Sequence, residues 1–537
     1  MKKLIALLLA VMMVLSLVAC GGTSEKTPDD GNSPAPSNPS DPSTPSDPAA
    51  PVGDDLTINV AVANDAGTLS PAFSTSTTFA VVCSMMEPLW DVTTTNDVIF
   101  LLCESVDFIS DTEQTLHLRQ GVKFHNGKPF TASDVIFSMK LHAGAGASGA
   151  PRVQTVDLEK TNIVDDYTID LHLLAPTIAN WTVLSQCIIY DEESYDEANA
   201  ATHPIGTGPY EFVSYVPNSE IKMQRNDNYW GEAPQAKYLN CKILGEASQR
   251  VNALETELID IGAITATDYD YVSGLGGVQI IGNYTGNYMM MNFNFGHNSV
   301  IYKNPDARRA LVHATNCDAI LKTVYLGHGK AMFCCVPDYC FDYDESFSNN
   351  SETYSLGYDV ELAKQLAESS GLAGQTITVM TNGTTENIRI AEMLQGMYSE
   401  IGVTVSIENY DAATAWQMSY DPESTWTISV GTGIAPNRRC GDLLVNGVRY
   451  NPGMSAEGAF ENNQEYLALA PQCMSLQDEG ELKDMLSKMI KWYNDEVLSF
   501  AMFDLETYMG VSTKIDPASV HLSVGSSGIR YGELKFA

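Results

Sequence analysis

The first 54 residues contain an apolar segment followed by a polar segment that is rich in Pro and Ser. Lys2 and Lys3 precede an unbroken apolar run over residues 4–15, and the small-residue sequence LVAC follows at residues 17–20. The run is shorter than the roughly 20 apolar residues that a membrane-spanning helix needs, so residues 1–19 are predicted to be a secretory signal peptide. Residues 20–54 are dominated by Pro, Ser, Asp, Thr and Gly, which predicts a disordered linker.

Downstream of residue 55, patterns typical of strands and of helices are mixed. Residues 210–213 and 221–224 predict two antiparallel strands, because they follow a tight turn rich in Gly and Pro at residues 206–209. Residues 358–371 and 387–405 predict amphipathic helices and strands. Their apolar residues recur near a helical period at Leu362, Leu366, Ile390, Met393, Leu394 and Met397.

Size and charge narrow the class of protein. The chain after residue 55 is long enough to form a large body of more than one lobe. The formal net charge is −37, and removal of the two signal-peptide lysines leaves 28 basic against 67 acidic side chains, a net charge of −39. Such acidity excludes nucleic acid as a partner, since phosphate binding needs a basic surface. It also favours a cationic or neutral ligand.

Ten cysteines follow Cys20. Cys334, Cys335 and Cys340 are clustered but lack the paired short spacings of a zinc site, so no metal site is predicted. A local disulfide and buried free thiols both stay open, because an extracellular location permits disulfides whose pairing cannot be read from sequence. The other seven are Cys83, Cys103, Cys187, Cys241, Cys317, Cys440 and Cys473.

Motifs that carry catalysis are not found in the sequence. There is no glycine-rich phosphate loop, no nucleophile elbow and no HExxH pattern. His117, His125 and His142 lack the fixed spacing of metal ligands, so a structural role is favoured for them. The sequence therefore predicts no enzymatic activity, no catalytic residues and no cofactor, and a hydrolase is the least favoured alternative.

The sequence LVAC at residues 17–20 resembles the lipobox of bacterial lipoproteins. This resemblance implies that Cys20 receives a diacylglycerol and becomes the new amino terminus, and two acyl chains hold a protein on a bilayer durably. The protein is then expected on the extracellular face of the cytoplasmic membrane, in the cell envelope, held by its lipid anchor. An ordinary signal peptide with a coincidental cysteine is the alternative.

Residues 203–230, HPIGTGPYEFVSYVPNSEIKMQRNDNYW, closely resemble the signature of the extracellular solute-binding proteins of family 5, which include oligopeptide, dipeptide and nickel binders. Four further blocks follow the order of that family. They are residues 67–90, residues 116–139 with a turn at Asn126-Gly127 and a helix capped at Thr131 or Ser133, residues 288–310, and residues 358–405.

The resemblance implies an α/β fold of two lobes, the periplasmic-binding-protein-like fold of type II, cluster C, with an extra subdomain inserted in the first lobe. Carried onto this chain, the first lobe comprises residues 55–90, 205–287 and 505–537. The inserted subdomain comprises residues 91–204, and the second lobe residues 288–504. In this fold the ligand lies between the lobes and closure about a hinge buries it.

The family resemblance also implies the function. The protein is expected to be the substrate-binding lipoprotein of an ABC importer, a monomer that captures an extracellular peptide or peptide-like solute and delivers it to permease subunits and, through them, to ATPase subunits. Two alternatives stay open. In the first, the same fold binds a sugar, a nickel chelate or another non-peptide solute. In the second, the protein serves as a nutrient or pheromone receptor.

One departure from the family concerns the ligand. Peptide binders of the family place an aspartate, which pairs with the α-ammonium group of the peptide, where this chain has Thr432, and no carboxylate lies between residues 423 and 442. Asp411 and other carboxylates outside this segment stay candidates for pairing with the ammonium group. The same segment carries Arg438 and Arg439, which suit a carboxylate or phosphate if they face the ligand. The predicted ligand-binding residues are Tyr288, Asn292, Trp416, Trp426, Thr432, Arg438 and Arg439.

Overall fold

The structure is a computed structural model that describes residues 56–537, apart from short internal segments. The predicted signal peptide, Cys20 and the predicted linker therefore lie outside the described residues. Among the helices of the described part, none combines the length and apolar character that a bilayer crossing requires. The internal segments outside the description are residues 74–78, 178, 297–299, 350–356, 422, 435–437, 450–452, 455–458, 477 and 524–527.

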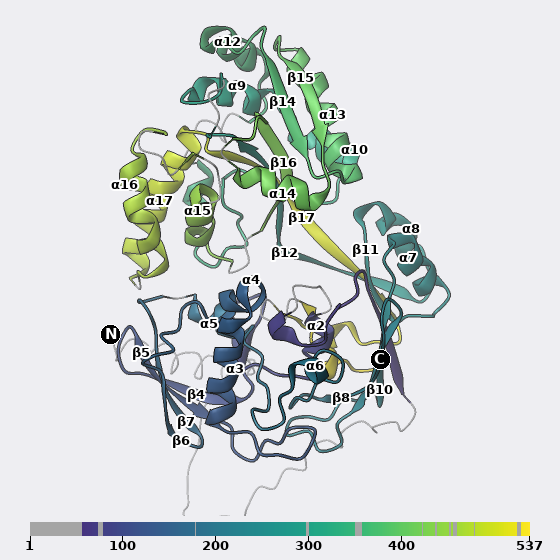
Figure 1. Ribbon diagram of the computed structural model, residues 1–537. Helices are drawn as coiled ribbons and strands as arrows, with labels where there is room; N and C mark the ends of the chain where they lie inside the picture. Colours follow the sequence, from purple (N-terminus) through teal and green to yellow (C-terminus); the bar gives the residue numbers. More distant parts are fainter. Residues whose placement is uncertain are drawn as a thin grey trace, which may run out of the picture. The chain divides into compact units, whose positions relative to one another are not determined.

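A mixed sheet of eleven strands runs through the described chain (Figure 1). Its order is β15-β14-β16-β12-β17-β11-β1-β10-β9-β8, with β13 pairing β17 at one side. These strands are β1 (Thr57–Val62), β8 (Tyr210–Val216), β9 (Glu220–Arg225), β10 (Tyr238–Ile243), β11 (Ile261–Ile264), β12 (Val278–Phe293), β13 (Lys330–Ala331), β14 (Thr376–Thr381), β15 (Thr404–Asn409), β16 (Ile428–Ile434) and β17 (Ser499–Ser512).

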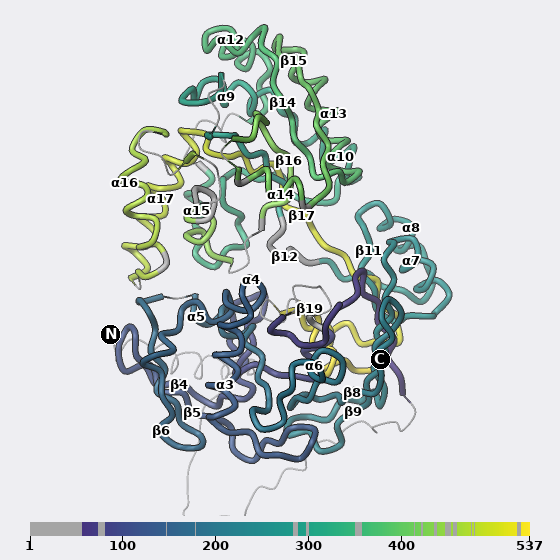
Figure 2. Tube along the Cα trace, viewed as in Figure 1, coloured from purple at the N-terminus to yellow at the C-terminus, as the bar shows by residue number. Residues whose placement is uncertain are grey.

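Two long antiparallel strands, β12 and β17, connect the two ends of this sheet, and their traces run side by side in Figure 2. Their pairing is regular from Val278 opposite Ser512 to Tyr284 opposite Glu506. The register then shifts before Tyr288 pairs with Asp504. The predicted lobe boundaries, 287/288 and 504/505, fall at this irregularity, and these boundaries stay predictions.

The half of the sheet formed by β11, β1, β10, β9 and β8 contains the motif of residues 203–230. The predicted antiparallel strands are confirmed as β8 and β9. Gly206 and Gly208 are required before them, because an added Cβ would lie 2.2 Å and 2.8 Å from the Met85 carbonyl oxygen. Buried apolar residues such as Ile58, Val60, Tyr210 and Ile221 belong to the core beneath these strands.

A separate four-stranded sheet, in the order β4-β5-β7-β6, lies in the segment predicted as the inserted subdomain. Helix α3 (Ala132–Gly144) lies in the chain between β5 and β6, and Thr131 is its N-cap in a capping box with Asp134, so the first of the two predicted caps is confirmed. The remaining strands are β2 (Trp90–Val92), β3 (Val98–Phe100), β4 (Cys103–Phe108), β5 (Glu113–Leu118), β6 (Asn162–Asp165), β7 (Thr168–His172), β18 (Leu522–Ser523) and β19 (Gly528–Ile529).

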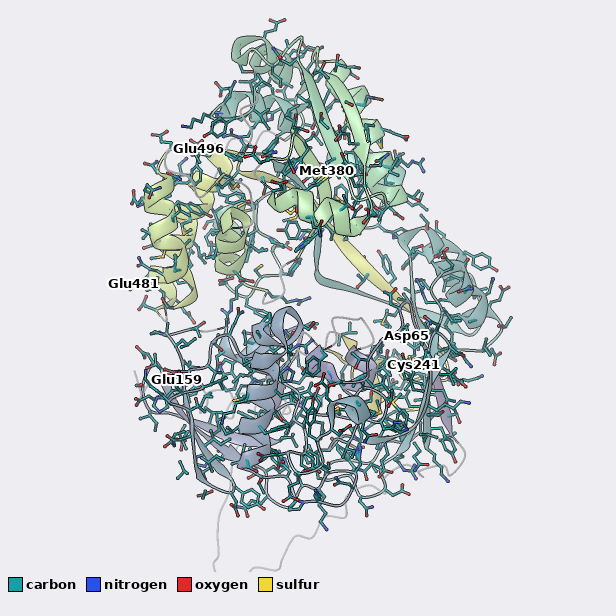
Figure 3. The ribbon with its side chains drawn as sticks, viewed as in Figure 1. Asp65, Glu159, Cys241, Met380, Glu481 and Glu496 are labelled. Carbon is teal, nitrogen blue, oxygen red and sulfur yellow. The ribbon has the colours of Figure 1, made fainter. Side chains whose placement is uncertain are left out.

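Helices contribute much of the core in the other half of the chain. The predicted amphipathic helices are confirmed as α12 (Val360–Ser370) and α13 (Thr385–Ser399), and Ile390 and Leu394 are fully buried. Exposed carboxylates such as Glu159 and Glu481 lie at the outside of the molecule in Figure 3. The other helices are α2 (Phe79–Val82), α4 (Gly146–Gly149), α5 (Asn180–Leu184), α6 (Glu197–Ala200), α7 (Ala247–Glu255), α8 (Tyr269–Ser273), α9 (Pro305–Ala314), α10 (Cys317–Val324), α14 (Ala412–Tyr420), α15 (Cys440–Arg449), α16 (Asn463–Leu469) and α17 (Glu479–Asp495).

Candidate functional site

Three of the predicted ligand-binding residues lie on the adjacent strands β12 and β16. Tyr288 pairs with Gly433, and the next pair along the strands is Met289 with Thr432. Because side chains alternate along a strand, Tyr288 and Thr432 point to opposite faces of the sheet. Tyr288 is buried, Thr432 is exposed, and Asn292, further along β12, is half-buried. The strands thus bring Tyr288 and Thr432 close in register but do not place them on one surface.

The two predicted tryptophans have different environments. Trp426 is 1% exposed, and its indole Nε1 donates a hydrogen bond to the carbonyl oxygen of Met418 in α14 at 3.0 Å. Trp416 lies on the same helix and is 65% exposed. Packing against α14 explains the position of Trp426, and a ligand-binding role for it stays a prediction. Trp416 presents an aromatic surface to solvent.

The two arginines that follow β16 both lie against aromatic rings. Arg438 is buried, its guanidinium carbon lies 5.3 Å from the centroid of the Tyr339 ring, and its Nη1 donates to the carbonyl oxygen of Thr94 at 2.6 Å. Burial lowers the pKa of Arg438. Arg439 is half-buried, 5.6 Å from the centroid of the Phe341 ring. Arg438 therefore has a structural hydrogen bond in this structure, and its binding of a solute stays a prediction.

Sequence reasoning missed a buried acid on β17. Asp504 pairs with Tyr288 of β12 and with Lys330 of β13, so a row of neighbouring positions crosses the sheet from Gly433 through Tyr288 and Asp504 to Lys330. Asp504 is 2% exposed, and its Oδ1 atom has no hydrogen-bond partner in the described chain. The signal was present in the sequence, because one carboxylate interrupts an otherwise apolar stretch, FAMFDL, at residues 500–505.

The charges around Asp504 come from β13 and the loop after it. Burial, together with the carboxylate of Asp338, raises the pKa of Asp504 to about 7, while the Lys330 ammonium opposes that rise. Lys330 is itself ion-paired with Asp338. Burial and the Asp504 carboxylate also raise the pKa of Tyr339, whose hydroxyl oxygen has no hydrogen-bond partner in the described residues. The surroundings of Asp504 thus compensate its charge only in part.

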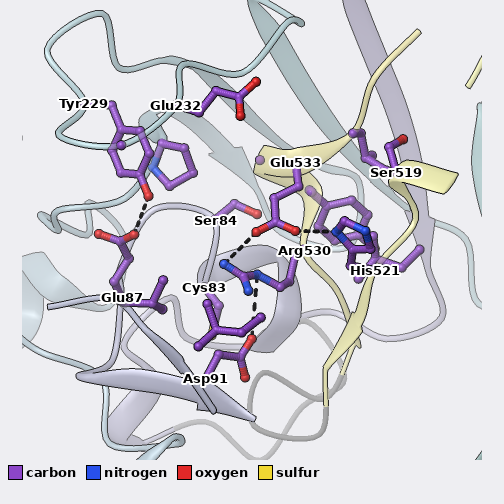
Figure 4. A pocket seen from close by; sticks show the side chains of 18 of the residues that line it. Cys83, Ser84, Glu87, Asp91, Tyr229, Glu232, Ser519, His521, Arg530 and Glu533 are labelled. Carbon is purple, nitrogen blue, oxygen red and sulfur yellow. Dashed lines mark hydrogen bonds and ion pairs between the residues drawn. The ribbon is translucent and has the colours of Figure 1, made fainter. Parts of the chain in front are cut away.

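A pocket of about 690 Å³ lies elsewhere, between residues 83–91, the loop after β9 and the carboxyl-terminal tail (Figure 4). Glu87 is buried there and accepts hydrogen bonds from three side chains: Thr207 Oγ1 at 2.8 Å, Tyr229 Oη at 2.6 Å and Trp230 Nε1 at 2.9 Å. Burial outweighs these bonds and raises the pKa of Glu87. This carboxylate links the predicted family blocks at residues 67–90 and 203–230.

The opposite wall of the same pocket carries a second charged group. Arg530 forms ion pairs with Glu533 at 2.7 Å and with Asp91 at 3.8 Å, and His521 lies 2.6 Å from Glu533. Burial raises the pKa of Asp91. The Arg530–Asp91 ion pair joins the carboxyl-terminal tail to residues 83–91, whereas the contacts of Glu533 with Arg530 and His521 lie within the tail. No motif in the sequence predicted this pocket.

Two of the three histidines singled out in the sequence, the half-buried His125 and the buried His142, contact backbone carbonyl groups, whereas His117 lies 3.0 Å from the exposed carboxylate of Asp107. His125 Nε2 lies 3.0 Å from the carbonyl oxygen of Gly208, and His142 Nε2 lies 3.1 Å from that of Ile188. Burial lowers the pKa of His142 to about 3, so its ring stays neutral. The geometry assigns the rings of His125 and His142 to packing, in keeping with the structural role that the sequence favours for them.

Comparisons with known proteins agree with the arrangement of the strands. The model of the family described as bacterial extracellular solute-binding proteins, family 5 Middle, matches residues 97–437, well over half of the chain. The dipeptide-binding protein of Escherichia coli is 28% identical over 382 residues, which cover 63% of this chain and 68% of that protein.

Solved structures show the same fold. NikA from Brucella suis, in complex with Fe(III)-EDTA, superposes with a TM-score of 0.79 at 19% identity, covering 90% of this chain and 100% of that one. The ABC transporter substrate-binding protein CtaP from Listeria monocytogenes gives a TM-score of 0.75 at 20% identity, with the same coverage. The predicted two-lobed α/β fold and the predicted family are confirmed, and the chain belongs to the bacterial extracellular solute-binding proteins of family 5.

Proposed function

We propose that this protein is the substrate-binding lipoprotein of an ABC importer, and that it captures an extracellular peptide or peptide-like solute and delivers it to membrane permease subunits. The observation that carries the proposal is the family match over residues 97–437. The dipeptide-binding relative from Escherichia coli supports a peptide as the solute. The substrate-binding protein from Listeria monocytogenes, described as part of an ABC transporter, supports the role in import. The family is one of binding proteins, so the proposed role is capture without catalysis.

The proposal includes a lipid anchor at Cys20 and a monomeric protein at the extracellular face of the cytoplasmic membrane. Support for the anchor is the sequence LVAC at residues 17–20. Metabolic labelling with palmitate tests it, with Cys20→Ala as the variant and Cys241→Ala, a buried cysteine of β10, as the matched control. Label should be lost from the Cys20 variant alone. Equal labelling of both variants would remove the anchor from the proposal.

The ligand class is tested on residues 51–537, which form a compact unit of their own. A ligand that binds the folded state and not the unfolded chain raises the melting temperature. The panel contains tripeptides, N-acetylated tripeptides, oligosaccharides and metal chelates. A rise in melting temperature with either peptide class supports the proposal, and a rise with sugars or chelates alone would refute the peptide assignment.

One other ligand class has specific support. The structure of NikA, which has the highest TM-score of the structures compared above, contains a metal chelate, Fe(III)-EDTA. A chelate is a compact anionic ligand, and Arg438 or Arg439 would suit it if either side chain turned toward the solute. Fe(III)-EDTA therefore belongs in the same melting experiment. Stabilisation by Fe(III)-EDTA that the variant Arg439→Gln removes would favour this second assignment.

A further inference from the structure

Asp504 stands out because a carboxylate in a nearly inaccessible position normally has a partner. Buried charges in proteins are paired or hydrogen-bonded, since an isolated ion loses its hydration on burial. Asp504 is 2% exposed, and neither β12 nor β13 supplies a hydrogen-bond donor to its Oδ1 atom. Such an orphaned acceptor on a central strand calls for a functional explanation.

The position of Asp504 in the sheet points to a binding role. It lies on β17, next to the register shift between the two long strands that connect the ends of the sheet. On one side is Tyr288, whose ring lies over Gly433, where an added Cβ would meet Tyr288 Cζ at 2.5 Å. On the other side is Lys330, at the short strand β13. Within this row, Asp504 therefore has an aromatic side chain as its neighbour on one strand and a charged side chain as its neighbour on the other.

The nearby charges compensate the Asp504 carboxylate only in part. Lys330 is the neighbouring cation, but its ammonium is ion-paired with Asp338, so two carboxylates share one lysine. Arg438 lies against the far aromatic neighbour, Tyr339. Tyr339 lies close enough for the Asp504 charge to act on its phenol, and the hydroxyl has no hydrogen-bond partner among the described residues. A cationic group with N–H donors would satisfy the carboxylate and the hydroxyl together.

We propose that Asp504 binds a cationic nitrogen of the transported solute, such as the free α-ammonium group of a peptide, with the Tyr339 hydroxyl as a second contact. This inference rests on the proposed peptide-binding function and specifies its ligand as one with a free amine. Tyr288, Lys330, Asp338, Tyr339 and Cys340 are the titratable groups that face this position. The protein is acidic throughout, with a net charge of −37, and this also favours a cationic group.

The test compares trialanine with N-acetyl-trialanine, which differ in the ammonium group, by calorimetry on residues 51–537. Asp504→Asn keeps the size of the side chain and removes the charge. It should weaken trialanine binding roughly 30-fold or more, since one partner of a buried charge pair is lost. The affinity for N-acetyl-trialanine should stay the same.

The matched control is Glu465→Gln, which removes a carboxylate that is 53% exposed and forms an ion pair with Lys488. It should change trialanine affinity less than about fivefold, as for an exposed ion pair. A second measurement needs no variant. Near about pH 6 the unliganded carboxyl of Asp504 is mostly protonated, so trialanine binding should release a proton, seen as a heat that depends on the buffer. N-acetyl-trialanine should release none.

The outcomes separate the two proposals. Equal effects of Asp504→Asn on both peptides, or binding of N-acetyl-trialanine alone, would overturn the role of Asp504 while peptide binding stands. Binding of neither peptide to the unmodified chain would overturn both. If Asp504→Asn does not fold, the proton release of the unmodified protein decides: release with trialanine alone supports the inference, and its absence rejects it.

Discussion

Asp504→Asn should make the stability of the unliganded protein less dependent on pH. The pKa of Asp504 is raised from 3.8 to about 7 in the folded state, so the folded protein retains a proton that the unfolded chain has released. The stability contributed by that proton is complete below 3.8 and is lost as the pH rises through 7. Each unit of pKa shift corresponds to about 1.4 kcal/mol, so the whole shift amounts to about 4 kcal/mol.

Urea unfolding of residues 51–537 and of the variant, each followed from about pH 5 to pH 8, measures this contribution. Relative to the unmodified protein, the free energy of unfolding of Asp504→Asn should rise by about 2 kcal/mol between pH 5 and pH 7, and the difference should level off by about pH 8. Asp338→Asn removes a carboxylate that helps to raise the pKa of Asp504, so it should reduce the pH slope of the unmodified protein without abolishing it. A constant difference between Asp504→Asn and the unmodified protein over this range would show that Asp504 ionises normally, and the reasoning would fail.

Three further predictions concern buried groups and an exposed one. Glu87→Ala leaves the buried Thr207 hydroxyl and two half-buried donors, on Tyr229 and Trp230, without their acceptor, so thermal unfolding should show a loss of about 3–6 kcal/mol, whereas Glu87→Gln should cost less than half of that. Trp426→Ala should cost about 3–5 kcal/mol because it empties a buried site, while Trp416→Ala should stay within about 0.5 kcal/mol; equal losses would contradict the assigned burial. Arg308→Met should cost about 3–5 kcal/mol in urea unfolding, because Arg308 is 1% exposed and donates to the carbonyl oxygens of Ile301 and Glu496; an unchanged midpoint would contradict this.

Local elements could be predicted where the pattern was long and the turn residues were specific. The strands β8 and β9 follow from the turn at residues 206–209 and from alternating apolar positions, and α12 and α13 follow from apolar residues at a helical period. Thr131 and Ser133 could both be named as candidate caps, because a hydroxyl suits the helix N–H groups that have no partner, and the structure shows that Thr131 is the cap. These features depend on interactions between residues that are close together in the sequence.

The candidate site was harder to predict, because burial and pairing join residues that are far apart in sequence. Trp426 and Trp416 have the same side chain ten residues apart, yet one is enclosed and one is exposed. Arg438 looked available for a ligand, but its guanidinium reaches the carbonyl oxygen of Thr94, 344 residues away. Nothing in the local pattern around residues 426–444 distinguishes these environments.

The sequence by itself determined the family, the α/β class and the position of a few elements, among them β8, β9, α12 and α13, because signature turns and hydrophobic periodicity are local properties of the chain. The tertiary structure alone decided that Asp504 lies opposite Tyr288 and Lys330, since strand register brings together residues separated by more than 170 positions. It also decided the ionisation of Asp504, because a pKa depends on the solvent and charges that surround the group in space.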